Sequence, residues 1–212
     1  MTKFLIIRHG YSKSNENGYF TGQTDVPLAT LGIEQAERTA EYLLESHTID
    51  AIYSSPLQRA RETASPIARK FRLPVSIADD LKEINGGAWE EKTPEEILRL
   101  YKGDYVLWQT DIGLARCTGG ENMQEVQLRA LNALREIAKQ NDGKTVAVTT
   151  HAGVIRALQC AWQRLPLSEM KHIAWVENAS VTTVTYDGEF ALQRVGDSRH
   201  LSTLKTNLPK EI

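Results

Sequence analysis

The stretch Leu5–Asn15 reads Leu-Ile-Ile-Arg-His-Gly-Tyr-Ser-Lys-Ser-Asn and changes abruptly from apolar to polar. Phe4–Ile7 has the length and β-branched content of a buried strand, whereas Gly10 and the serines after it are typical of a loop. Arg8 and His9 are therefore predicted at the carboxyl end of a strand. In open α/β sheets ligands bind at this edge, because the loops that leave the strands converge there.

A histidine at such an edge has four common uses: a nucleophile, a general base, a metal ligand, or a structural residue held by hydrogen bonds. The Arg8-His9 dipeptide does not choose among them, because short motifs recur by chance. The choice depends on which other side chains reach the same edge.

The same order of strand, histidine and glycine recurs later in the chain. Residues 145–149 (TVAVT) indicate a central strand, which ends in Thr150-His151-Ala152-Gly153 and is followed by a helix from about Val154 to Trp162. His151 is thus expected at the same edge of the sheet as His9.

Between and after these motifs, strand and helix patterns alternate. Residues 180–186 and 189–195 indicate a closing hairpin with a two-residue turn. The fold class predicted is α/β: a three-layer α/β/α sandwich with a mostly parallel sheet and an antiparallel edge hairpin. The other elements expected are a helix from Leu31 capped by Thr30, a strand at Ala51–Tyr53, a helix from about Leu57 to Phe71 kinked or split by Pro66, a strand at Val75–Ile77, a helix capped by Thr93, and a helix from Asn122 to about Gln140.

The composition is that of an ordinary globular protein. A chain of 212 residues with 41% hydrophobic and 25% charged residues suits a single domain, residues 1–212. A net charge of -2 without charged blocks argues against nucleic acid and against an anionic membrane as partners. The sequence shows no signal peptide or apolar span, so a cytoplasmic location is expected. Cys117 and Cys160 are expected to be reduced packing residues.

Five polar side chains share the predicted edge: Arg8, His9, Arg59, Glu83 and His151. Taken singly, each has a structural explanation; together they suit phosphoryl transfer. Arginine forks bind the oxygens of a phosphate monoester, a neutral imidazole attacks phosphorus, and a carboxyl group protonates the leaving alkoxide. No close cluster of metal ligands is visible, so neither a metal nor another cofactor is expected.

The chain resembles the histidine phosphatase superfamily, which includes the cofactor-dependent phosphoglycerate mutases and their phosphatase relatives. The resemblance implies a single histidine phosphatase-like domain over residues 1–212. The motifs that carry it run nearly end to end: Leu5 to Asn15, Thr21-Gly22, Tyr53 to Ala60, Leu81-x-Glu83, Gly87-x-Trp89-Glu90, Gly120-Glu121 and Thr150 to Arg156.

By this resemblance His9 is the phosphorylated nucleophile, Arg8, Arg59 and His151 bind the phosphate, and Glu83 is the proton donor. Residues that the resemblance places against substrate are Asn15, Ser12, Thr21, Gly22, Ala152 and Gly153.

The resemblance leaves three functions open. The first is a metal-independent phosphomonoesterase that hydrolyses a small phosphorylated metabolite through a phosphohistidine; the others are a phosphoglycerate mutase and a non-catalytic phospholigand-binding module. The basic insertion of the mutases is absent, and His151-Ala152-Gly153 replaces their His-Gly-Asn, which favours the short phosphatase-like branch. The expected partner is a small phosphate ester, and a homo-oligomer is left open.

Residues 85–120 give the weakest pattern, and a lid or specificity insertion is the hypothesis for them. Phe20, Ile84, Trp89 and Trp108 could give the pocket an apolar wall, although any one of them is typical of ordinary packing.

Overall fold

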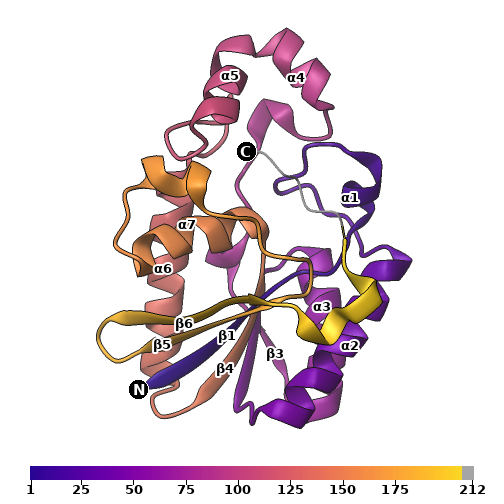
Figure 1. Ribbon diagram of the computed structural model, residues 1–212, viewed down its shortest axis with the longest axis vertical. Coiled ribbons are helices and arrows are strands. Elements are labelled where there is room, and N and C mark those ends of the chain that lie inside the picture. The colour runs from indigo at the N-terminus through magenta and orange to yellow at the C-terminus, as the bar shows by residue number, and fades with distance from the viewer. Residues whose placement is uncertain (207–212) are drawn as a thin grey trace.

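A computed structural model describes residues 1–206 of the chain. Its centre is a six-stranded sheet in the order β3-β2-β4-β1-β5-β6 (Figure 1). The pairs β3-β2, β2-β4 and β4-β1 are parallel, while β1-β5 and β5-β6 are antiparallel. The predicted parallel sheet with an antiparallel hairpin at one edge is therefore confirmed. The strands are β1 (Thr2–Arg8), β2 (Ala51–Ser54), β3 (Val75–Ile77), β4 (Thr145–Thr150), β5 (Val181–Tyr186) and β6 (Phe190–Asp197).

Alternate residues of β1 enter two separate cores, because successive side chains of a strand point to opposite faces. Phe4 and Ile6 belong to the larger core, together with α6 (Met123–Gln140) and α7 (Ala152–Trp162). Leu5 and Ile7 belong to the smaller core, with α2 (Thr30–Ser46) and α3 (Gln58–Phe71). The sheet is thus covered on both faces, as the three-layer prediction requires.

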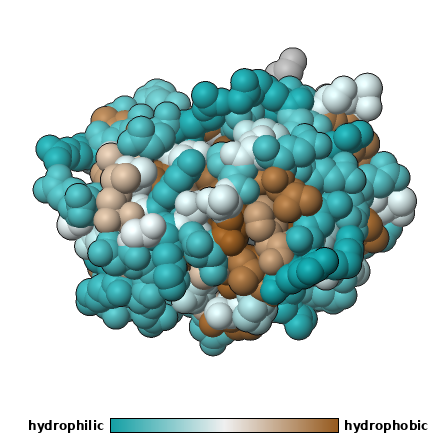
Figure 2. Space-filling view, turned by 90° about the horizontal axis from the view of Figure 1, so that it is seen from below, coloured by the Kyte–Doolittle hydropathy of each residue, from teal (hydrophilic) through white to brown (hydrophobic). Residues whose placement is uncertain are grey.

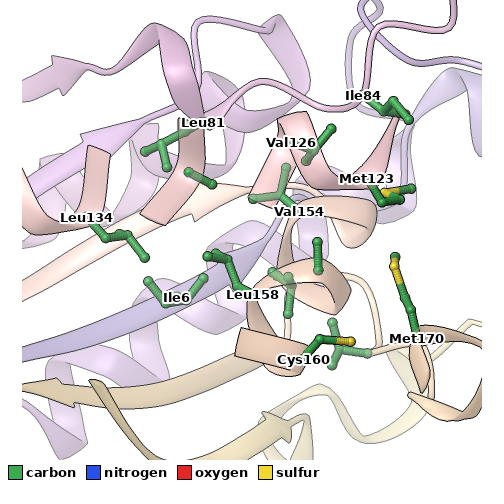
Figure 3. Close-up of a cluster of buried hydrophobic side chains, with 14 of the residues drawn as sticks. Ile6, Leu81, Ile84, Met123, Val126, Leu134, Val154, Leu158, Cys160 and Met170 are labelled. Atoms are coloured by element: carbon green, nitrogen blue, oxygen red, sulfur yellow. The ribbon is translucent and has the colours of Figure 1, made fainter. Parts of the chain in front are cut away.

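The larger core continues to the edge of the sheet at which β1 and β4 end. Figure 3 shows its side chains packed between the sheet and the helices, with Ile84 and Met123 at one end. The apolar core therefore adjoins the edge at which the polar residues were predicted.

Above this edge lies the segment that the sequence left least defined. It contains the short helix η2 (Gly87–Trp89), α4 (Pro94–Leu100) and α5 (Lys102–Thr110), drawn in magenta at the top of Figure 1. The capping box predicted at Thr93 is present, with Pro94 as the first helical residue. The remaining short helices are α1 (Lys13–Asn17), η1 (Asp79–Leu81), η3 (Leu167–His172) and η4 (Arg199–Leu204).

Several local predictions were wrong. Thr30 is the first residue of α2 and not its cap, because Ala29 is extended and donates its backbone N–H to Tyr11. Pro66 does not split α3, which is continuous because packing of the buried helix face outweighs one missing backbone hydrogen bond; the predicted kink stays a prediction. The hairpin turn has three residues, 187–189, because Tyr186 pairs with Phe190.

Two further differences lie next to the histidines. The polar stretch after Gly10 contains the short helix α1, capped by Ser12, where only a loop was expected. The helix after His151 begins at Ala152, two residues earlier than predicted, so His151 is its N-cap residue.

The opposite end of the molecule is mainly hydrophilic, with one hydrophobic area near the middle of the view (Figure 2). Within residues 1–206, no helix combines the length and the apolar content that a membrane crossing requires.

Candidate active site

Two histidines meet where β1 and β4 end. The strands are parallel neighbours, with Arg8 opposite Thr150, and the backbone N–H of His9 donates to Thr150 O at 2.9 Å. The ring centroids of His9 and His151 are consequently 5.1 Å apart. Strand-end reasoning thus correctly placed side chains that are far apart in the sequence.

The ring of His9 is buried and fixed in one orientation. Its Nδ1 lies 2.8 Å from Gly10 O. A carbonyl only accepts, so Nδ1 carries the proton and the lone pair of the neutral ring is on Nε2. Burial, followed by the positive charges of Arg59 and Arg8, lowers the pKa of His9 well below its usual 6.5. His9 is therefore a neutral imidazole at physiological pH.

His151 lies deeper than His9 and has no exposed surface. Its Nε2 is 2.8 Å from Ser55 Oγ, and its buried Nδ1 has no hydrogen-bond partner among the residues described. Burial, with the charges of Arg59 and His9, also lowers the pKa of His151. Two neutral rings therefore lie side by side between arginines.

Both arginines are held by backbone carbonyls. Arg59 donates from Nη1 to Thr24 O at 3.0 Å and from Nη2 to Gly22 O at 2.7 Å. Arg8 donates from Nη1 to Val176 O at 2.6 Å, while its buried Nε has no partner within residues 1–206. Burial lowers the pKa of Arg8 to about 10, so it remains charged at neutral pH. In the described chain neither guanidinium forms an ion pair, so both can attract an anion.

The carboxylate of Glu83 is anchored at the start of α7. Its Oε2 accepts from the backbone N–H of Gly153 and its Oε1 accepts from that of Ile84, each at 3.0 Å. A Cβ at position 153 would lie 2.5 Å from Glu83 Oε1. A side chain at this position would displace the carboxylate, so glycine preserves the contact between Glu83 and the start of α7.

A second carboxylate, Glu90, organises the loop that holds Arg59. It accepts from the backbone N–H groups of Gly22 at 3.0 Å, Gln23 at 2.7 Å, Thr24 at 3.2 Å and Gly86 at 2.9 Å, and from the hydroxyl of Thr24 at 2.7 Å. Sequence reasoning assigned no role to Glu90. The feature of the sequence that could have indicated its role is an acidic residue near an irregular loop, because the backbone N–H groups of such a loop need hydrogen-bond partners.

A cavity of about 320 Å³ opens beside these groups. We call Arg8, His9, Arg59, Glu83 and His151 the polar corner; all except the deeper His151 line the cavity. Of the predicted substrate-binding residues, Asn15, Thr21, Ala152 and Gly153 also line it.

Ser12 and Gly22 are not among the residues that line the cavity, so their contact with substrate stays a prediction. The hydroxyl of Ser12 is buried against Ser14 and Asn15, where it caps α1. Gly22 acts through its carbonyl, which holds Arg59.

The other side of the cavity is apolar and comes largely from residues 84–123. Phe20, Ile84 and Trp108 lie on it as suggested, whereas Trp89 is fully buried behind them and packs edge-on against Phe20 and Trp108. We call the apolar part of the lining the apolar wall: Phe20, Ile84, Pro94, Ile97, Tyr105, Trp108, Met123 and Trp175. Trp175 was not predicted, because residues 163–180 form no regular pattern.

The side chains of the described residues were also compared with the requirements of a metal site. Among residues 1–206 there is no group of three or more His, Cys, Asp or Glu side chains placed to hold a metal ion. The two cysteines are buried and unpaired, as predicted.

A doubly covered α/β sheet with histidines and arginines around a hollow at its strand ends defines a class of phosphate-ester enzymes. The chain belongs to the histidine phosphatase superfamily (branch 1), whose family model matches residues 4–198. This confirms the family and the fold class expected from the sequence.

Similar proteins place the chain among the phosphatases of the family. It is 33% identical to phosphoserine phosphatase 1 of Hydrogenobacter thermophilus, covering 87% of this chain and 86% of that protein. It is 32% identical to a metal-independent phosphoserine phosphatase of Arabidopsis thaliana, covering 96% and 85%. The solved structure of Bacillus stearothermophilus YhfR superposes with a TM-score of 0.90 at 32% identity, covering 95% of this chain and 100% of that one. The chain is accordingly a phosphoric monoester hydrolase.

Proposed function

We propose that the protein hydrolyses its phosphate monoester without a metal, in two steps, through a phosphohistidine on His9. The observation that carries this proposal is the polar corner itself: two neutral imidazoles with centroids 5.1 Å apart, beside two arginines held by carbonyls. A neutral ring supplies the lone pair that attacks phosphorus, and the guanidiniums bind the charged oxygens of the phosphoryl group.

In the first step Nε2 of His9 forms a bond to phosphorus as the bond to the ester oxygen breaks. The alcohol leaves with a proton taken from the carboxyl group of Glu83. In the second step the Glu83 carboxylate removes a proton from water, the water oxygen bonds to phosphorus, and the phosphorus–nitrogen bond breaks. Inorganic phosphate leaves, and both His9 and protonated Glu83 are restored.

The phosphoryl group needs a fixed charge environment in both steps. Arg8 and Arg59 supply it from anchored positions, so little reorganisation accompanies the reaction. His151 has Ser55 as a partner on Nε2 and a free Nδ1 in the described chain, which suits a donor toward a phosphoryl oxygen when the ring carries its proton on Nδ1.

The test uses the purified protein in excess chelator with 4-nitrophenyl phosphate. His9→Ala is expected to lower kcat by about 10⁴-fold or more, as loss of a covalent nucleophile does in other enzymes. The unchanged protein is expected to give a phosphohistidine after an alkaline quench, and His9→Ala none. The exposed His172 provides the matched control His172→Ala.

Full activity of His9→Ala, or loss of all activity in chelator, would contradict the proposal. Glu83→Gln separates the two steps further: it is expected to slow alkyl phosphates far more than the aryl ester, whose leaving group needs little protonation.

A further inference from the structure

The two sides of the cavity differ in their chemistry. Within residues 1–206, Arg8 and Arg59 are the basic side chains that line it, and Glu83 is the acidic one. Both guanidiniums belong to the polar corner. Half of the other lining residues form the apolar wall, to which Phe20, Tyr105, Trp108 and Trp175 contribute aromatic rings.

We propose that the protein acts on phosphate monoesters whose alcohol is uncharged and carries an apolar ring, an inference that rests on the function proposed above. With the phosphoryl group bound to Arg8 and Arg59, the alcohol part extends along the apolar wall. Apolar surface that leaves water there lowers the free energy of the bound ester.

A charged alcohol has no comparable partner in this cavity. The carboxylate of phosphoserine would meet no cation beyond the two already occupied by phosphate. A buried charge without a partner is unfavourable. The preference expected here therefore differs from the substrate in the names of the phosphoserine phosphatases that the chain resembles.

The apolar wall is held in place by packing behind it. Phe20 lies edge-on to Trp89 and Trp108, at 5.5 Å between centroids in each pair. On the other side, the guanidinium of Arg156 is 4.2 Å from the ring centroid of Trp175 and donates to the carbonyls of Ile173 and Met170. The rings are thus fixed before substrate binds, which reduces the ordering that binding requires.

The volume of the cavity limits the size of the alcohol part of the ester. A volume of about 320 Å³ is near the lower end of ligand sites, which starts at about 300 Å³. One or two rings attached to the phosphoryl group suit this space better than a nucleotide or a phosphopeptide.

The experiment compares three esters of primary alcohols, so that the leaving groups are similar: 2-phenylethyl phosphate, ethyl phosphate and phosphoserine. The expected order of kcat/KM is 2-phenylethyl, then ethyl, then phosphoserine, with about 100-fold between the first and the last. The ratio for one preparation is independent of the fraction of active protein.

A charge introduced into the apolar wall tests whether the wall causes the preference for 2-phenylethyl phosphate over phosphoserine. Phe20→Arg is expected to reduce the ratio of 2-phenylethyl phosphate to phosphoserine by about tenfold or more, because it removes a ring and adds a cation. Phe20→Leu keeps most of the ratio. Leu128→Arg, which adds the same charge at an exposed position of α6, leaves the ratio unchanged.

The outcomes separate the two proposals. Turnover of all three esters with phosphoserine equal or preferred would overturn the substrate class and leave the phosphohistidine mechanism intact. Absence of both turnover and phosphohistidine with every ester would overturn the mechanism, and the substrate class with it. If Phe20→Arg yields no folded protein, the substrate class is tested by the ratio of kcat/KM for 2-phenylethyl phosphate to that for phosphoserine, measured on the unchanged protein and on Phe20→Leu.

Discussion

The polar corner and the apolar wall border one cavity, yet they are built in different ways. The corner is assembled at strand ends, and its side chains are oriented by backbone groups such as Gly22 O, Val176 O and the N–H of Gly153. The wall comes mostly from loops and short helices whose rings are oriented by one another. A change in the corner should therefore affect every substrate, whereas a change in the wall should alter the choice among substrates.

Among the changes that test this comparison, the largest effect is expected at Arg59. Arg59→Lys keeps the charge but loses the planar fork that bonds Gly22 O and Thr24 O and faces the anion. We expect kcat/KM to fall by about 10²- to 10³-fold for aryl and alkyl phosphates alike. Steady-state kinetics on both esters checks this; the exposed Arg61, with Arg61→Lys, is the control. A loss confined to one ester would contradict the comparison.

A smaller effect is expected at Glu90, which touches the loop and not the cavity. Glu90→Gln places an amide among backbone N–H donors, so the carbonyls that orient Arg59 lose their support. We expect kcat/KM to fall by about 10- to 100-fold, with a weaker competitive inhibition by inorganic phosphate. The neighbouring exposed Glu91, as Glu91→Gln, provides the control. Unchanged phosphate inhibition would show that Glu90 does not act through Arg59.

The wall should behave differently. Trp108→Leu removes a ring that lines the cavity but keeps an apolar side chain. We expect kcat/KM for 2-phenylethyl phosphate to fall about tenfold and that for ethyl phosphate to change less than threefold. Steady-state assays of the variant and the unchanged protein with both esters measure these changes, and thermal unfolding checks that the variant is stable. An equal fall for both would mean that the wall also shapes the corner.

The smallest effect is expected from mild acid. A histidine with a pKa of 6.5 would be about three-quarters protonated at pH 6.0. Because burial and the two arginines lower the pKa of His9, its ring stays mainly neutral as the pH falls through 6.5, and it takes up a proton only at lower pH. An NMR titration of the histidine rings, assigned with His9→Ala, measures this. A midpoint at or above 6.5 would contradict the combined effect of burial and the two arginines on the pKa of His9.

These two regions also differ in how far the sequence predicted them. The meeting of His9 with His151 follows from a general rule, since parallel strands end at one edge and each of these residues follows an apolar run. The wall depends on the direction of side chains in residues 85–120, where helices of seven and nine residues leave little periodicity. Trp89 and Trp108 are equally apolar, yet only one of them faces the cavity.

The loops beside the polar corner show the same limit of prediction from sequence. Ser12 and Gly22 lie in the right loops, but hydrogen bonds within those loops turn the first side chain away and direct the second residue's carbonyl to Arg59. Glu90 could not be assigned because its partners are backbone N–H groups, which are the same for every sequence. Motif spacing therefore predicted which segments form the site better than it predicted which atoms face the ligand.

The central place of β1 in the sheet has a consequence for how the protein is made. β1 pairs with β4 and β5, whose residues follow it by more than a hundred positions. At ordinary rates of translation its apolar run waits on the order of ten seconds for those partners. Until β4 and β5 have been made, β1 lacks its strand neighbours, so the edge at which His9 meets His151 is complete only after both strands have left the ribosome.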